Sequence, residues 1–152
     1  MIATKTRIAS HDVKRFAPGM SPAIVALGEA AAPAGFEPEL IELVNLRVSQ
    51  INGCAYCVQY HISNLQEIGT APAKINLVVA WEEAGIFSER EEAAFAWAEA
   101  LTLIAETHVP DAAFEAAREV FSEQELVGLT AVVCAINCWN RIAVPFRYAP
   151  EI

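Results

Sequence analysis

Apolar side chains recur every three to four residues along most of the chain, the spacing that places them on one face of an α-helix. In residues 37–51, for example, Leu40, Leu43, Val44 and Val48 fall on a single helical face. Similar spacing predicts helices over residues 22–29, 37–51, 55–68, 72–83, 88–106, 111–120 and 122–144. No run alternates apolar and polar residues as a strand would, so the pattern predicts an all-α bundle of about six to seven helices.

Two of the predicted helices begin with a capping box, in which a serine and a glutamate three residues later bond to each other's backbone N–H. The pairs are Ser88 with Glu91 and Ser122 with Glu125. At the other end of the last helix, Pro145 is expected to end the regular structure, because proline lacks the N–H that a helix interior needs.

The chain of 152 residues is long enough for one domain with its own core. We expect a single domain over residues 1–152, in which residues 1–20 form a less regular N-terminal segment. The hydrophobic fraction of 55 % is high for this length, and it is distributed over periodic stripes rather than in one block of membrane-spanning length. Excess apolar surface of this kind favours a homo-oligomer.

The net charge of −9 argues against two classes of partner. Phosphate backbones and anionic membranes would be repelled, so we expect neither nucleic acid nor a membrane as a partner. Residues 1–20 carry several charges with no long apolar run between them, and so lack the central region of a signal peptide. We therefore expect a cytoplasmic protein.

The segment Cys54-Ala-Tyr-Cys57-Val-Gln-Tyr-His61 carries two thiols and an imidazole directly after Asn52-Gly53. If a helix starts near Gly53, a rotation of about 100° per residue places Cys57 about 60° from Cys54, with His61 between them on one face. Unpaired N–H groups and the helix dipole in a first turn favour an anion and lower the pKa of a thiol. The segment therefore favours redox chemistry by a reactive dithiol.

Two other interpretations of these three residues stay open. Cys54 and Cys57 could be small buried hydrophobes, with His61 a hydrogen-bonded core histidine. The same residue types are also zinc ligands. Structural zinc normally has four protein ligands, however, and no second Cys-x-x-Cys or histidine pair accompanies these. We therefore expect neither a metal nor another cofactor.

A carboxylate on the preceding helix is predicted to reach His61. The helices over residues 37–51 and 55–68 are joined by only a few residues, which favours an antiparallel αα-hairpin. Glu42 lies ten residues before Asn52 and His61 nine after it, so at 1.5 Å per residue both sit roughly 14 Å from the turn. Glu42 could then orient His61 and raise its basicity while His61 withdraws a proton from a cysteine. Glu39 competes for this role but lies one turn further away, and a solvated surface position is the alternative for Glu42.

These residues resemble the active-site pattern of the AhpD-like alkyl hydroperoxidases within the carboxymuconolactone decarboxylase family. The pattern is Glu42, then Cys54 twelve residues later, then Cys57 and His61. The sequence of residues 46–57, Leu-Arg-Val-Ser-Gln-Ile-Asn-Gly-Cys-Ala-Tyr-Cys, is similar to the corresponding segment of the family. The likeness extends to residues 92–100 and 135–141 and covers most of the chain from about Pro38.

The resemblance implies an all-helical protein, commonly trimeric or hexameric, that reduces hydroperoxides. By position, it implies that Cys57 is the peroxidatic sulfur and Cys54 its resolving partner and proton donor, with Glu42 and His61 as the proton relay. Such a cycle requires a dithiol or lipoyl-type reductant to reopen the disulfide. The chain departs from AhpD at Tyr56, where AhpD has a second histidine, and a tyrosine does not supply a base near neutral pH.

Three rival functions remain at this stage. A decarboxylase of the same family would remove carbon dioxide from a lactone acid without redox chemistry and would not need the dithiol. A non-enzymatic redox-sensing subunit would use the disulfide to change an interface. A general disulfide reductase is a further alternative, although the predicted bundle differs from the βαβ context of thioredoxin.

A second cysteine pair, Cys134 and Cys138, lies in the most apolar predicted helix. Because free cysteine is among the most buried residue types, we expect both to pack in the core. Asn137, Asn140 and Arg141 are polar residues in the same apolar setting and need hydrogen-bond partners that the sequence does not identify.

Overall fold

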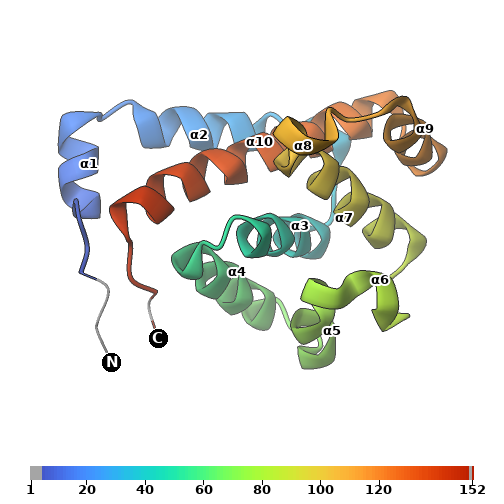
Figure 1. The fold of residues 1–152 in the computed structure, drawn as a ribbon, viewed down its shortest axis with the longest axis horizontal. Helices are drawn as coiled ribbons and strands as arrows, with labels where there is room; N and C mark the ends of the chain where they lie inside the picture. Colours follow the sequence, from blue (N-terminus) through green and yellow to red (C-terminus); the bar gives the residue numbers. More distant parts are fainter. Residues whose placement is uncertain (1–4, 151) are drawn as a thin grey trace.

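The computed structural model describes residues 5–150 and 152, and every regular element in them is helical (Figure 1). The α-helices are α1 Ser10–Phe16, α2 Met20–Glu29, α3 Pro38–Ile51, α4 Ala55–Glu67, α5 Pro72–Leu77, α6 Trp81–Ala84, α7 Glu89–Thr102, α8 Ile104–Thr107, α9 Asp111–Val120 and α10 Glu123–Phe146. Two 3₁₀ turns, η1 Ala32–Ala34 and η2 Val78–Ala80, lie between them. The all-α prediction is confirmed.

The structure divides the chain into more helical segments than the six or seven predicted. The helix expected over residues 72–83 is split into α5, η2 and α6, because Ala80 leaves helical geometry with φ −126° and ψ 38°. The helix expected over 88–106 is divided at Leu103 into α7 and α8. Residues 10–16, inside the segment expected to be less regular, form α1. Periodicity thus located the longer helices but neither α1 nor the local departures within the predicted helices.

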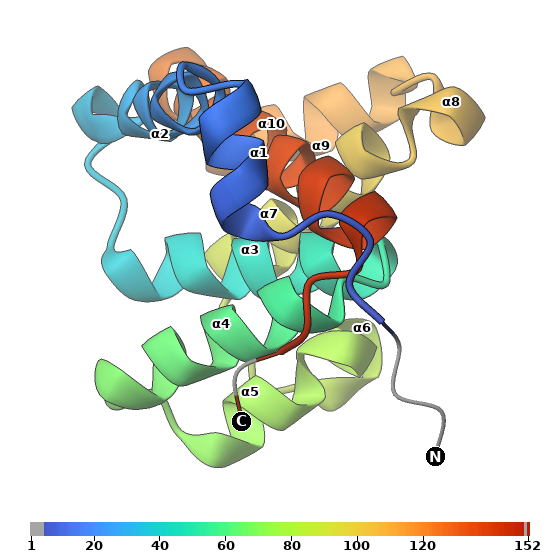
Figure 2. The same ribbon diagram turned by 90° about the vertical axis from the view of Figure 1, so that its left-hand side faces the viewer.

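Helix α10 is the central element of the bundle. It runs alongside α2 and packs against α3, α4, α7 and η1 (Figures 1 and 2). Among the residues that the structure describes, it is the one helix with the length and composition to cross a membrane. Its side chains Leu129, Val133 and Asn140 are nevertheless almost completely buried within the protein. Its apolar character is therefore that of a helix in the core of the fold.

The end of α10 differs from the prediction. Pro145 does not terminate the helix but lies inside its last turn, and the helix continues to Phe146. Arg147 then adopts a left-handed conformation with φ 55°, and its N–H bonds to the carbonyl of Val144 at 3.1 Å. The proline is tolerated near the end of the helix, and the left-handed residue performs the termination.

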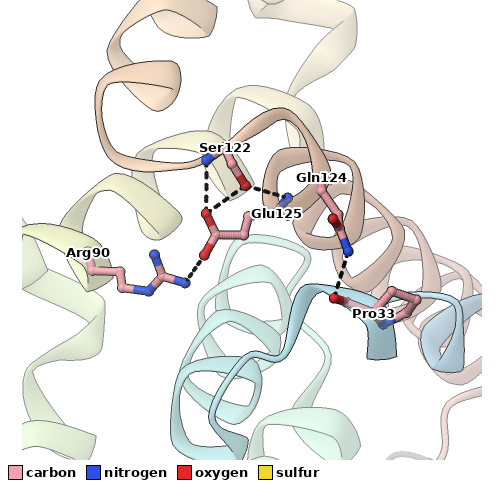
Figure 3. Close-up of polar contacts among 5 residues, drawn as sticks. All are labelled: Pro33, Arg90, Ser122, Gln124 and Glu125. Atoms are coloured by element: carbon pink, nitrogen blue, oxygen red, sulfur yellow. Dashed lines mark hydrogen bonds and ion pairs between the residues drawn. The ribbon is translucent and has the colours of Figure 1, made fainter.

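Both predicted capping boxes are present. At α10, Ser122 Oγ accepts a bond from the N–H of Glu125 at 3.3 Å, and Glu125 Oε2 accepts one from the N–H of Ser122 at 2.9 Å (Figure 3). Arg90 of α7 reaches Glu125 Oε1 at 2.6 Å. The N–H of Ser122, followed by the guanidinium of Arg90, lowers the pKa of Glu125 to about 2. Gln124 binds the carbonyl of Pro33 at 2.8 Å, so the start of α10 is tied to both α7 and η1.

Candidate functional site

The two cysteines of the Cys-x-x-Cys segment meet at the start of α4. Gly53 has φ 64°, a left-handed conformation suited to glycine, and it turns the chain from α3 into α4. Cys54 is the N-cap of α4, and its sulfur accepts a bond from the N–H of Cys57 at 3.2 Å. The two residues have Cα atoms 5.3 Å apart and are joined by a disulfide. Both are buried, so the disulfide lies inside the fold.

Glu42 contacts His61 as the hairpin geometry predicted. Glu42 Oε2 and His61 Nδ1 are 2.7 Å apart, and the His61 side chain is only 8 % exposed. His61 follows Cys57 by one helical turn on α4, which places the two side chains on the same side of that helix. The short distance couples a carboxylate on α3 to an imidazole beside a sulfur.

Asn64 is a third member of this cluster that the sequence analysis did not identify. Its side-chain amide donates to the same Glu42 Oε2 at 3.2 Å. Asn64 follows His61 by three residues, so both side chains lie on the side of α4 that faces α3. This i, i+3 spacing was the available signal, since it brings Asn64 within reach of any group that binds His61.

Cys57, His61, Glu42 and Asn64 all line one cavity of about 840 Å³. Its walls come from α1, α2, α3, α4, α10 and the segment after α10. Figure 2 shows α1 in front of α3 and α10, with α4 below them. Cys54 does not line this cavity, although it is bonded to Cys57. Of the two cysteines, Cys57 is therefore the one at the cavity wall.

Four aromatic side chains line the same cavity as Cys57: Tyr56, Tyr60, Trp139 and Tyr148. The Tyr56 ring stacks with that of Tyr60 at 6.4 Å and meets that of Tyr148 edge-on at 5.8 Å. Burial, with a smaller effect of Tyr56, raises the pKa of Tyr148, so its phenol stays neutral at physiological pH. Tyr56, the departure from the AhpD pattern, thus contributes an aromatic wall at this position.

Polar contacts hold the turn between α3 and α4 against α10. Asn52 donates to Asn137 Oδ1 at 3.0 Å and to Asn140 Oδ1 at 2.8 Å. Asn140 in turn donates to Ser49 Oγ at 3.2 Å, and Arg141 binds Asn137 Oδ1 at 2.6 Å. These bonds supply the partners that the three polar residues of α10 were expected to need. They fix the turn immediately before the dithiol.

The prediction for the second cysteine pair was wrong for Cys134 and only partly met by Cys138. Cys134 is exposed and Cys138 is half-buried, and neither forms a disulfide.

In the described residues, no cluster of three or more histidine, cysteine, aspartate or glutamate side chains has an arrangement that could hold a metal ion.

Residues 18–100 match the sequence model of the carboxymuconolactone decarboxylase family. The chain is 39 % identical over 103 residues to the uncharacterised protein YdfG of Bacillus subtilis, covering 68 % of this chain and 70 % of YdfG. It is 30 % identical over 97 residues to the uncharacterised protein YnjA of Escherichia coli, covering 64 % of this chain and 53 % of YnjA.

Solved structures of AhpD-like proteins have a similar fold. A protein of unknown function from Agrobacterium tumefaciens, provisionally assigned as the antioxidant defence protein AhpD, superposes with a TM-score of 0.89 at 41 % identity, over 97 % of this chain and 99 % of that one. A peroxidase-related protein from Ralstonia eutropha with an AhpD core has a TM-score of 0.77 at 24 % identity, over 91 % and 74 % of the two chains. The latter likeness is one of fold alone.

Proposed function

This chain belongs to the carboxymuconolactone decarboxylase family, and we propose that it is a thiol-dependent peroxidase that reduces alkyl hydroperoxides. The observation that carries the proposal is the convergence of Cys57, His61 and Glu42 on one cavity, with Cys54 bonded to Cys57 behind it. The 41 % identity to the AhpD-assigned Agrobacterium protein supports the same assignment.

In the first step Cys57 attacks the hydroperoxide as a thiolate. Its N–H and those around it lie in the first turn of α4, where the helix dipole favours negative charge. A sulfur–oxygen bond forms and the oxygen–oxygen bond breaks, so the sulfur is oxidised to a sulfenic acid and the peroxide is reduced to an alcohol. The alkoxide takes up one proton as it leaves. His61, oriented by Glu42, relays protons between Cys57, Cys54 and the cavity.

In the second step Cys54 attacks the sulfenic sulfur of Cys57. A disulfide forms, the sulfur–oxygen bond breaks, and hydroxide leaves with the proton of Cys54 as water. The product is the Cys54–Cys57 bond present in this structure. A dithiol or lipoyl-type reductant then reopens the bond by thiol exchange and is itself oxidised to a disulfide. We further propose that the protein acts in the cytoplasm as a homo-oligomer, a trimer or a hexamer.

The decisive experiment is a stoichiometric oxidation. One equivalent of cumene hydroperoxide is added to the fully reduced protein, and the cysteine bonds are mapped by peptide mass spectrometry. We expect a rapid disulfide between Cys54 and Cys57 and one equivalent of 2-phenyl-2-propanol. Unchanged thiols would contradict the proposal.

Alkylation of the reduced protein and addition of a dithiol separate the rival functions. A lactone decarboxylase would keep its activity after both cysteines are alkylated, because that reaction does not use them. A redox-sensing subunit would change its oligomeric state on oxidation but would not turn over peroxide when a dithiol is supplied. For a peroxidase, alkylation abolishes turnover and added dithiol sustains it.

A further inference from the structure

The cavity beside Cys57 is far larger than the reacting group of a hydroperoxide requires. Its volume is about 840 Å³. A water molecule occupies roughly 30 Å³ in the liquid, and hydrogen peroxide has only one oxygen more. Pockets that enclose whole organic ligands measure about 300 to 1,000 Å³. The size of the cavity therefore fits a substrate with a substantial organic part.

The walls of the cavity are suited to an apolar group. Aliphatic side chains from four helices line it, among them Val13 of α1, Ile24 of α2, Ile41 of α3, and Val132, Ile136 and Ile142 of α10. The charged residues at the cavity do not form a site for an ionised substrate. Lys14 and Glu29 are both exposed and of opposite sign, and Glu42 is already engaged by His61 and Asn64.

Trp139 is the wall residue best placed to contact an aromatic group. It projects from α10 into the cavity and is half-buried. Among the described residues its indole makes no ring contact, whereas the other three aromatic side chains of the wall do. Aromatic rings favour offset or edge-to-face contact with one another, with a gain beyond the area they bury. Trp139 therefore has ring surface left for a ligand, and Tyr148, which packs on Tyr56 and Phe146, lines the same cavity.

We infer that this cavity selects bulky, uncharged hydroperoxides that carry an aromatic group, with the ring held between Trp139 and Tyr148 while the peroxide oxygen reaches Cys57. The inference rests on the proposed peroxidase function. It assigns a specificity role to residues that take no part in the chemistry, and it predicts discrimination against hydrogen peroxide and small alkyl hydroperoxides.

The test compares two hydroperoxides with the same reacting group. Cumene and tert-butyl hydroperoxide are both tertiary, and they differ by a phenyl ring in place of a methyl group. The rate constant for oxidation of the Cys54–Cys57 dithiol is measured with each, and the ratio is divided by the ratio found with free dithiothreitol. We expect a corrected ratio of at least about ten, since burying a ring adds apolar contact to the transition state.

Trp139→Ala and Tyr148→Ala should each lower the corrected ratio, by roughly fivefold for Trp139, while Trp139→Phe should retain most of it. Val127→Ala is the matched control, because Val127 lies on the same helix, is 72 % exposed and does not line the cavity. Tyr148 lies outside α10, so its variant keeps the test decisive if Trp139→Ala does not fold. A wild-type corrected ratio near one, or an unchanged ratio in both alanine variants, would overturn the inference.

A binding measurement separates this inference from the peroxidase proposal. The product alcohol 2-phenyl-2-propanol is titrated into the protein, and tryptophan fluorescence is compared with a titration of tert-butanol. Saturable binding of the aromatic alcohol, weakened in Tyr148→Ala, supports the inference even if neither hydroperoxide oxidises the dithiol, a result that would refute only the peroxidase. Equal and non-saturable responses to both alcohols would refute the cavity's selectivity while leaving the peroxidase intact.

Discussion

Helices α4 and α10 each begin with two residues three positions apart whose side chains contact each other, but the contact serves a different purpose in each helix. In α10, Ser122 is the N-cap and Glu125 the third helical residue, and their side chains meet in a capping box. In α4, Cys54 is the N-cap and Cys57 the third helical residue, and their sulfurs meet in a disulfide. The start of α4 thus keeps one half of a capping box: Cys54 Sγ accepts the N–H of Cys57, whereas the N–H of Cys54 bonds to the carbonyl of Ser49.

The comparison explains why the start of α10 stabilises and the start of α4 can react. The carboxylate of Glu125 is held by Ser122 and Arg90, which lower its pKa to about 2. At α4 the cap acceptor is a sulfur, a weaker acceptor than a hydroxyl or carboxylate oxygen. The turn before α4 is instead secured by Asn52 through its bonds to Asn137 and Asn140. The dithiol can therefore change its redox state while other residues hold the backbone.

The largest expected effect is that of Cys57→Ser. Because a serine hydroxyl is a far poorer nucleophile than a thiolate, we expect peroxide turnover to fall at least about a thousandfold. Stability in the reduced state should fall modestly, because Cys57 is buried in the core and serine places a hydroxyl there. Turnover is followed by loss of hydroperoxide with excess dithiol.

Cys134→Ser is the matched control for this experiment, because Cys134 is a free, exposed cysteine. We expect it to retain wild-type turnover. Equal losses in the two variants would mean that thiol chemistry is not specific to the start of α4.

The next largest effect is expected for Glu42→Gln. The amide can still bond to His61 but carries no charge to orient it as a base, so the rate of dithiol oxidation should fall roughly 10- to 100-fold. Glu39→Gln is the control, because Glu39 lies three residues earlier on α3 and is paired with Lys74 at 3.5 Å instead. Stopped-flow oxidation with cumene hydroperoxide measures both. If Glu39→Gln were the slower variant, the assignment of Glu42 to the relay would fail.

At α10 the expected effect is on stability rather than on chemistry. Glu125→Gln should lower the free energy of unfolding by roughly 1 to 2 kcal/mol at pH 7, because it loses the charged bond to Arg90. Glu125 has a folded-state pKa of about 2 against an ordinary 4.5, so its contribution is complete above pH 4.5 and is lost as the pH falls towards 2. Urea unfolding at pH 7 and pH 3 measures this.

The control for Glu125→Gln is the peroxidase rate of the folded variant, which should equal that of the wild type. A stability difference that does not shrink between pH 7 and pH 3 would show that the carboxylate charge is not what stabilises the start of α10. A slower reaction would instead link this helix start to the chemistry, against the comparison drawn above.

Local helical geometry determined what the sequence could predict. The capping boxes depend on residues three apart, and the contact between Glu42 and His61 depends on a short turn and a fixed rise per residue. Burial on α10 depends instead on which neighbours cover each face. Cys134 looked like a core residue by composition, but α2, α3 and α7 pack on other sides of the helix and leave it exposed.

The cavity could not be predicted from the sequence either, because it also depends on how distant segments pack together. Val13 of α1, Trp139 of α10 and Tyr148 after α10 reach it from opposite ends of the chain. The two ends are brought together by contacts such as that of the Arg7 N–H with the carbonyl of Phe146 at 2.9 Å. No periodic pattern within one helix encodes such a meeting.

Asn64 combines local helical spacing with a contact to a second helix, and its substitution gives the smallest predicted effect. Asn64→Ala removes one donor to Glu42 Oε2 but leaves the 2.7 Å contact with His61 in place. In the proposed mechanism Asn64 is a positioning residue, so its loss should slow dithiol oxidation only about threefold to fivefold. Asn64→Asp places a second carboxylate beside Glu42, and the repulsion should slow the reaction further and make it more strongly pH-dependent between pH 5 and 8. If both variants react as fast as the wild type with an identical pH profile, the amide contributes only to the packing of α3 on α4, and the relay consists of Glu42 and His61 alone.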